Sequence, residues 1–195
     1  MRSGPVDTPV LVITGPSGVG KGTLIRGLLE RIPGLELAVS ATTRPPREGE
    51  ADGREYWFLS PEEFDRRVAE GDFVEHAVYA GNRYGTLRSE LARHARGTVL
   101  EIDLQGARQV RETLPEAVQI FIEPPSLEAL RARLEERGSD SPEQIRERLA
   151  VAPQELAAKE EFAYRVVNDD LERALEELEE LAATMCPPPP AEPAS

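Results

Sequence analysis

The sequence is poor in cysteine and contains no long apolar segment. Its 195 residues include a single cysteine, Cys186, so no disulfide can form within the chain. No apolar run approaches the ~18 residues that a membrane-spanning helix needs. Met1–Pro9 also lacks the apolar core of a secretory signal. These absences predict a cytoplasmic protein with no membrane segment.

Positive charge is also scarce. Lys and Arg total 23 against 36 Asp and Glu, which gives a formal net charge of -13. Such an acidic chain is unsuited to non-specific binding of nucleic acid or anionic membranes, because both need a broad positive surface. Lysine is especially rare, since only Lys21 and Lys159 occur. If the substrates are anions, the chain must gather its positive charge at particular places.

Apolar strand patterns alternate with helical ones, which predicts an α/β fold of three layers, with a parallel sheet between helices. We expect strands at 10–13, 35–40, 98–102, 117–122 and 164–167, and helices at 21–32, 87–96, 104–114, 127–137, 142–160 and 171–185. The stretch 40–86 differs, because it has short strands, loops and a turn at 80–83. The length suits one domain, in which 40–86 is an inserted lobe.

A glycine-rich loop follows the first strand and matches G-x-x-x-x-G-K through Gly15, Pro16, Ser17, Gly18, Val19, Gly20 and Lys21. Between a strand and a helix, such a loop turns backbone N–H groups toward phosphate oxygens. Lys21 can reach the outer phosphates of a nucleoside triphosphate. The usual pattern places Ser or Thr after the lysine for the Mg²⁺ shell, but Gly22 stands there. Thr23 is therefore the expected metal-side hydroxyl.

An acidic strand end is expected near such a metal. The strand 98–102 carries Glu101 and is followed by Asp103. Strand alternation puts these two carboxylates on the same side. An acid at a strand end is by itself common and often only faces solvent. The phosphate loop favours a functional interpretation, with Glu101 and Asp103 just outside the Mg²⁺ ligands.

Two arginines, Arg44 and Arg47, lie three residues apart on a proline-stiffened polar loop. Two forked guanidinium groups suit a terminal phosphate monoester. For two arginines on a loop, a solvated basic surface is the usual alternative.

Several motifs, in order, resemble the guanylate kinase family. They are Ser40-x-Thr42-Thr43-Arg44-x-x-Arg47-x-Gly49-Glu50, Gly53-x-x-Tyr56-x-Phe58, Phe73-Val74-Glu75-His76-Ala77, Gly81-Asn82-Arg83-Tyr84-Gly85-Thr86, Glu101-Ile102-Asp103-Leu104-Gln105-Gly106-Ala107 and Val167-Asn168-Asp169. The resemblance covers about 10–182. It implies a P-loop nucleoside monophosphate kinase that transfers the γ-phosphate of ATP to GMP with Mg²⁺.

The resemblance also implies roles for individual residues. Guanine would be recognised by Ser40, Glu75 and Thr86, and the GMP phosphate by Arg44, Arg47, Tyr56 and Tyr84. Asp103 would lie near the guanine or the metal. ATP would contact residues 15–23, the lid arginines Arg133, Arg137 and Arg148, and Asn168 near the adenine. Catalysis would depend on Lys21, Arg44, Arg137 and Arg148.

The same resemblance implies a division of the chain. The core would comprise 8–39, 87–126 and 160–185, the GMP-binding lobe 40–86, and a helical lid 127–159. Residues 186–195 hold five prolines in ten positions, which predicts a disordered tail.

Two other functions stay open at this stage. Guanylate-kinase-like modules of scaffold proteins bind phosphopeptides, but they typically lack a working phosphate loop. A kinase of the same fold could act on a sugar phosphate, although Glu75 with Ser40 and Thr86 favours guanine. The oligomeric state is left open.

Overall fold

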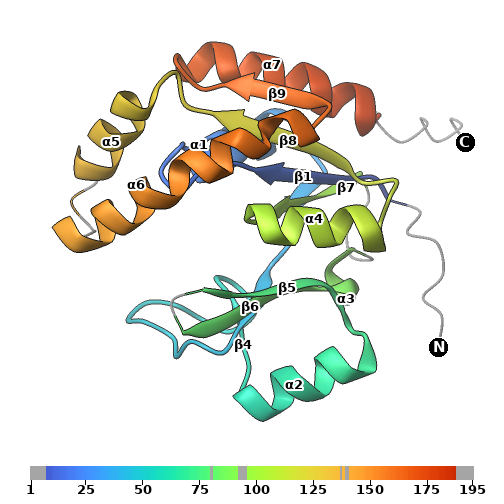
Figure 1. Cartoon of the computed structure of the whole chain (residues 1–195). Coiled ribbons are helices and arrows are strands. Elements are labelled where there is room, and N and C mark those ends of the chain that lie inside the picture. Colours follow the sequence, from blue (N-terminus) through green and yellow to red (C-terminus); the bar gives the residue numbers. More distant parts are fainter. Residues whose placement is uncertain (1–7, 80, 92–95, 137, 139–140, 188–195) are drawn as a thin grey trace, which may run out of the picture.

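The computed structural model describes residues 8–79, 81–91, 96–136, 138 and 141–187. The chain forms a large parallel sheet covered by helices, with a second, smaller sheet beneath it (Figure 1). The α/β class and the parallel core are thus confirmed. Among the described residues, no helix has the length and apolar character that crossing a membrane requires.

The large sheet has the order β2-β7-β1-β8-β9, and every pairing in it is parallel. Its strands are β1 (Val10–Thr14), β2 (Leu35–Leu37), β7 (Gly97–Glu101), β8 (Val118–Glu123) and β9 (Tyr164–Val167). β1 lies in the middle, paired with β7 on one side and β8 on the other. The loop that follows β1 therefore leaves the sheet at the carboxyl ends of its central strands, where open α/β sheets bind ligands.

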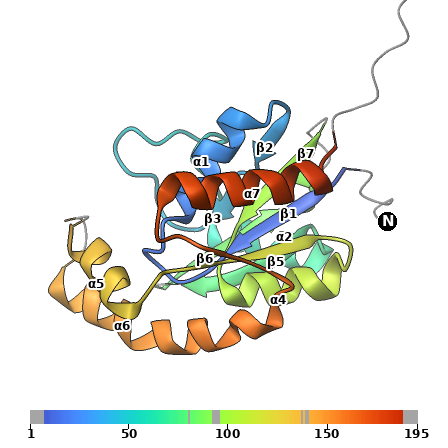
Figure 2. The same cartoon turned by 90° about the horizontal axis from the view of Figure 1, so that it is seen from above.

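Alternation along β1 supplies both faces of the core. Leu11 and Ile13 join the apolar cluster under α1 (Lys21–Arg31) and α7 (Leu171–Met185). Val10 and Val12 point the other way, into the cluster under α4 (Leu104–Thr113). Figure 2 shows α7 lying across the strands. A strand buried on both faces reads as a continuous apolar run, as this one does.

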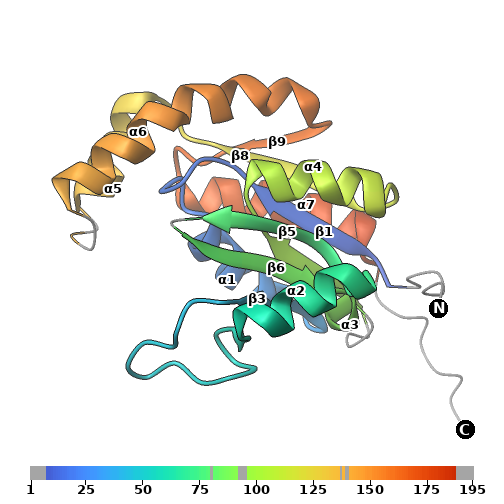
Figure 3. The ribbon, with the colours of Figure 1, turned by 60° about the horizontal axis from the view of Figure 1, so that its bottom comes forward.

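The smaller sheet is mixed and has the order β4-β3-β6-β5. Its strands are β3 (Ser40–Thr42), β4 (Trp57–Phe58), β5 (Phe73–Tyr79) and β6 (Asn82–Leu87), and α2 (Pro61–Glu70) packs on it through Phe64 (Figure 3). Ser60 caps α2 by accepting from the N–H of Glu63, and Gly71 ends it at φ 75°. The Ser60 cap and the end of the helix at Gly71 are both as the sequence predicts.

Three helices complete the described chain. α3 (Arg88–Leu91) connects the small sheet back to β7, and α5 (Leu127–Glu136) leads toward α6 (Pro142–Ala157), which runs into a 3₁₀ turn at Ala158–Glu161. Ser141 and Gln144 form a reciprocal capping box at the start of α6. Both α5 and α6 contribute to the cluster under α1, through Leu130, Leu134 and Ala152.

Some predicted boundaries are wrong. The single strand expected at 35–40 is two strands in different sheets, because the chain leaves the large sheet after Leu37 and enters the small one at Ser40. The turn expected at 80–83 instead contains the start of β6 at Asn82. The helix expected at 87–96 is described only as Arg88–Leu91, and 92–95 lie outside the described residues.

Cys186 was assigned to the tail, but its side chain is fully buried in the cluster under α1. A Cβ on Gly97 would lie 2.9 Å from its sulfur. The packed chain therefore extends to Cys186. Residues 188–195 lie outside the described part.

Candidate active site

The loop after β1 depends on glycine backbone geometry. Gly15, Gly18 and Gly20 have φ angles of 145°, 86° and 101°, a region that side chains disfavour. A Cβ on Gly15 would also lie 2.4 Å from the carbonyl oxygen of Ile122 in β8. The loop thus packs against the neighbouring strand before α1 begins at Lys21. The N-terminus of α1 faces the same loop and favours an anion there.

Lys21 folds back onto this loop. Its Nζ donates to the carbonyl oxygens of Gly15, at 2.7 Å, and Pro16, at 3.2 Å. Burial lowers the pKa of Lys21, and the carboxylates of Glu101, Glu155 and Asp103 act in the opposite direction. The ammonium group is thus held within the loop that the sequence predicted to bind phosphate.

Asn168 and Arg133 support the loop from outside. Asn168 is buried, and its Nδ2 donates to the carbonyl of Val19 at 2.8 Å. Arg133, on α5, donates from Nη1 to the same carbonyl at 3.1 Å and from Nη2 to the carbonyl of Asn168 at 2.7 Å. Two residues expected to contact ATP therefore bind backbone carbonyls here.

A cleft of about 940 Å³ opens beside the loop. It is lined by Ser17, Gly18, Gly20, Lys21, Gly22, Thr23, Arg26, Glu101, Arg133, Asn168, Asp169, Asp170 and Leu171. Most of the predicted ATP-binding residues thus come together. Arg26 was missed by sequence reasoning, although its position one helical turn after Gly22 places it on the same side of α1.

α6, which lies within the predicted lid 127–159, also contacts the phosphate loop. Arg148, on α6, donates from Nη1 to the hydroxyl of Ser17. Glu155 lies on the same helix, near Lys21, and burial raises its pKa. Sequence reasoning did not single out this glutamate. Arg137 lies outside the described residues.

The acidic pair, Glu101 and Asp103, lies close enough to Lys21 to influence its pKa. A Cβ on Gly22 would lie 3.7 Å from Oε2 of Glu101, so this carboxylate closely approaches the start of α1. Asp103 accepts from the N–H of Gly106 at 2.8 Å and caps α4. Within the described ranges, no group of three or more His, Cys, Asp or Glu could hold a metal. Mg²⁺ fits this setting, because it commonly binds through one or two protein groups, water and substrate phosphates.

The three residues expected to read guanine form one row across the small sheet. Ser40 of β3 pairs with Thr86 of β6, and Thr86 pairs in turn with Glu75 of β5. The Thr86 hydroxyl donates to Oε1 of Glu75 at 2.7 Å. Thr86 thus lies between Ser40 and Glu75, which are 35 positions apart along the chain.

Glu75 is 5% exposed, and burial raises its pKa to about 7. The Asp103 carboxylate acts in the same direction, while the Thr86 hydroxyl opposes it. The backbone of the next residue, His76, is fixed by α4: Gln109 accepts from its N–H at 3.0 Å and donates to its carbonyl at 2.8 Å. A rigid, buried carboxylate of this kind is typical of a binding site.

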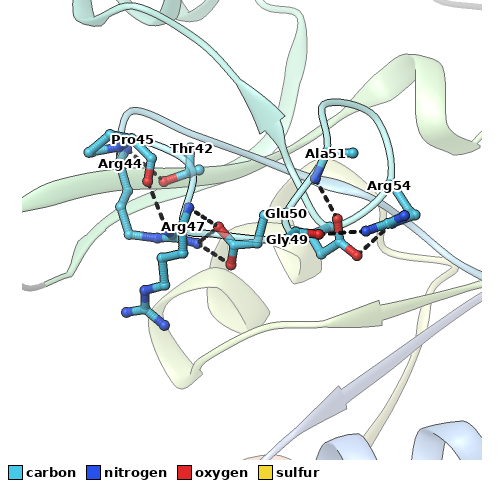
Figure 4. A network of polar contacts seen from close by, with 9 residues as sticks. Thr42, Arg44, Pro45, Arg47, Gly49, Glu50, Ala51 and Arg54 are labelled. Atoms are coloured by element: carbon cyan, nitrogen blue, oxygen red, sulfur yellow. Dashed lines mark hydrogen bonds and ion pairs between the residues drawn. The ribbon is translucent and has the colours of Figure 1, made fainter.

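Three of the residues expected to bind the GMP phosphate, Arg44, Tyr56 and Tyr84, lie together at the small sheet. Arg44 lies over the ring of Tyr56 at 5.3 Å, and Tyr56 contacts Tyr84 edge-on at 6.0 Å. Nη2 of Arg44 lies 2.9 Å from both oxygens of Glu50, which also accepts from the backbone N–H of Arg47 at 2.7 Å. Figure 4 shows the Arg47 guanidinium extending away from Glu50. Glu50 thus contacts both arginines. The sequence motif alone had assigned no role to this glutamate.

A phosphate loop at the centre of a parallel sheet, with a second polar site on an attached small sheet, defines a P-loop nucleotide kinase. A model of the guanylate kinase family matches residues 7–184. The guanylate kinase of Gloeobacter violaceus is 53% identical over 185 residues, 93% of this chain and 90% of that protein. That of Synechocystis sp. is 54% identical over 175 residues, 88% and 92%.

Among solved structures, the guanylate kinase of Anaplasma phagocytophilum is similar, with a TM-score of 0.72 and 34% identity over 93% of this chain and 87% of that one. The chain belongs to the guanylate kinase family. Its activity is that of an ATP:GMP phosphotransferase.

Proposed function

We propose that the two polar sites divide the substrates between them. The loop 15–23 and the cleft beside it bind ATP, and the lobe 40–86 binds GMP. The observation that carries this assignment is the row Ser40–Thr86–Glu75, because it joins hydrogen-bonding groups of three strands around one buried carboxylate. The core 8–39, 87–126 and 160–185 positions the two sites, and 127–159 acts as a lid.

Glu75 is the proposed base-reading group. When ionised, its two oxygens can accept from the ring N–H and the amino group of guanine, a pair of donors that adenine lacks. A site with a buried hydrogen-bonding group discriminates strongly, because the wrong base leaves that group unpaired. Thr86 donates to the carboxylate, Ser40 follows in the same row, and Asp103 lies close enough to influence the pKa of Glu75.

Arg44, Arg47, Tyr56 and Tyr84 are proposed to bind the GMP phosphate. In the structure, Glu50 accepts from the Arg44 guanidinium with both oxygens. A phosphate monoester carries the same kind of anionic oxygens and would share or displace this contact. The guanidinium of Arg47 extends away from Glu50 and is available to the same phosphate.

Transfer needs a GMP phosphate oxygen in line with the γ-phosphorus of ATP and neutralisation of the charge on the transferring group. Lys21 would move from its loop carbonyls to the phosphates, and Arg137 and Arg148 would approach from the lid. Arg133 and Asn168 would keep the loop in shape beside the nucleotide. Mg²⁺, when bound with ATP, would neutralise phosphate charge; Thr23 would hold it, with Glu101 and Asp103 just outside.

The proposed setting is the cytoplasm, where ATP and GMP are available. Purified protein with ATP and Mg²⁺ should form ADP much faster with GMP than with AMP, UMP or ribose phosphates, as a coupled assay can measure. Faster turnover of AMP would contradict the guanine assignment. A Glu75→Gln variant should lose selectivity between GMP and AMP, and unchanged selectivity would contradict its role.

A further inference from the structure

Two segments connect the small sheet covalently to the large one. The first is Ala38–Val39: the N–H of Ala38 donates to Val99 in the large sheet, at 2.9 Å, and Ser40 already pairs in the small sheet. The second leaves β6 at Leu87 and passes through α3 to β7. The orientation of the lobe 40–86 relative to the phosphate loop depends on these connections.

Glu90 lies on α3, within the second of these segments. It is 2% exposed, and it follows Leu87, which packs in the lobe, and precedes Leu91, which packs in the core. Its Oε2 accepts from the backbone N–H of Val39 at 2.9 Å. Its Oε1 accepts from the indole Nε1 of Trp57 at 3.0 Å. One carboxylate of the second connection thus contacts both the first connection and the edge strand β4 of the lobe.

Trp57 carries this contact further. The far edge of its ring lies against Gly53: a Cβ there would be 2.9 Å from the Cη2 and Cζ3 atoms of the indole. Gly53 in turn donates its N–H to the carbonyl of Tyr56 at 2.9 Å. Tyr56 is the ring beneath Arg44. A continuous series of contacts therefore leads from Glu90 to the proposed phosphate-binding residues of the GMP lobe.

We propose that Glu90 is a positioning residue that fixes the GMP-binding lobe against the core through Val39 and Trp57. The inference rests on the proposed binding of GMP by 40–86. Hydrogen bonds to a buried carboxylate are stronger than those between neutral groups, and two donors facing two oxygens define one orientation. Glu90 touches neither substrate, so its effect on the reaction is through the placement of the lobe.

Two variants separate this role from a general loss of stability. Glu90→Gln keeps the shape but offers one acceptor to two N–H donors, so one bond is lost. Trp57→Phe removes only the indole donor and leaves the bond from Val39. Glu112→Gln, an exposed carboxylate of α4, is the matched control. All are assayed below the temperature at which circular dichroism detects unfolding.

We expect Glu90→Gln to raise KM for GMP by ~10-fold, the effect of one lost bond to a charged group, and to leave KM for ATP within about twofold of the parent. Trp57→Phe should raise KM for GMP in the same direction. Glu90→Gln leaves one acceptor for two donors, and Trp57→Phe leaves only the Val39 donor to serve, so the double variant should cost less than the product of the two single effects. Glu112→Gln should match the parent.

Trp57 is the only tryptophan of the chain, so intrinsic fluorescence reports on this contact directly. Glu90→Gln should shift its emission even without substrate. Equal increases in both KM values, or multiplicative effects in the double variant, would overturn the proposal. Arg44→Ala, measured in parallel, tests the GMP lobe itself. If it raises KM for GMP while Glu90→Gln does not, the positioning role alone is wrong.

Discussion

At the scale of single residues, the chain's two lysines offer an internal comparison. Lys21 lies in the phosphate loop, bonded to Gly15 and Pro16. Lys159 lies in the 3₁₀ turn after α6, where its Nζ is 2.8 Å from Oε2 of Glu123. The two have the same chemistry, but Lys21 is the one that lies at the proposed site of the ATP phosphates.

Lys21→Ala should therefore lower kcat by ~10²-fold or more, since a charge aimed at the transferring phosphate is lost. Lys159→Ala should stay within about twofold of the parent, because a partly exposed ion pair contributes little. Steady-state kinetics with ATP and GMP would measure both. Comparable losses in the two variants would argue against a special role for Lys21.

Glu75 predicts a pH dependence. Burial raises the pKa of Glu75 in the folded protein to about 7. Below this pH the free enzyme therefore carries a protonated Glu75, and the protonated oxygen can no longer accept a hydrogen bond from guanine. We expect kcat/KM for GMP to fall as pH drops below about 7, because this parameter reports the free enzyme. The Glu75→Gln variant should lack that limb. The phosphate of GMP titrates near pH ~6 and affects the parent and the Glu75→Gln variant alike. Identical pH profiles of kcat/KM in the two proteins would therefore contradict the assignment.

The same pKa has a consequence for folding. A carboxyl whose pKa is higher in the folded than in the unfolded chain favours folding most when protonated. Its contribution to the free energy of unfolding is therefore lost as pH rises from the ordinary glutamate range to about 7. If Glu75 reads guanine as proposed, its burial lowers the stability of the fold at the pH where the ionised carboxylate binds best.

At the scale of elements, the phosphate loop depends on neighbours distant in sequence. β8 approaches Gly15, α5 supplies Arg133, and Asn168 follows β9. These contacts fix the loop's backbone before a nucleotide arrives. Preorganised N–H groups lower the cost of binding phosphate, since no ordering remains to be done.

Gly15→Ala should accordingly destabilise the fold by at least about 3 kcal/mol, because a Cβ would meet backbone as well as strain φ. Gly71→Ala is the matched control: Gly71 also has a positive φ, of 75°, but nothing lies within 4 Å of an added Cβ. Left-handed strain alone costs about 1–2 kcal/mol. Urea unfolding followed by circular dichroism measures both; equal losses would mean that the contact with Ile122 is unimportant.

At the scale of the whole molecule, Cys186 ties the end of α7 to the sheet. It is the only thiol, it is fully buried, and burial raises its pKa. Arg96 donates from Nε to its carbonyl at 3.0 Å, which joins the end of α7 to the start of β7. The last helix is thus integrated with the strand that carries Glu101.

We expect Cys186 to react with a thiol reagent at least ~10³-fold more slowly in the native protein than in urea, because reaction requires opening of a core segment. The labelling rate at increasing urea should follow unfolding measured by circular dichroism. Rapid, complete labelling without denaturant would show that α7 detaches independently of the rest.

The phosphate loop, most of the strands and helices, and the resemblance to guanylate kinases could all be predicted from the amino-acid sequence. These features are local, since glycines at fixed spacing, alternating apolar residues and helix caps act within a few positions. The proposed role of Ser40, Thr86 and Glu75 in reading guanine was also predicted, but only through the resemblance. Nothing in their spacing indicates that Ser40, Thr86 and Glu75 are neighbours.

Where the chain passes from one sheet to the other, and what joins the two sheets, became visible only in the folded molecule. The segment 35–40 cannot reveal that it divides between sheets, because a short strand pattern does not specify which strand will be its partner. Likewise Glu90, Glu50 and Cys186 look ordinary in sequence. Their environments come from residues far away along the chain, and burial and partnership are properties of the packed molecule.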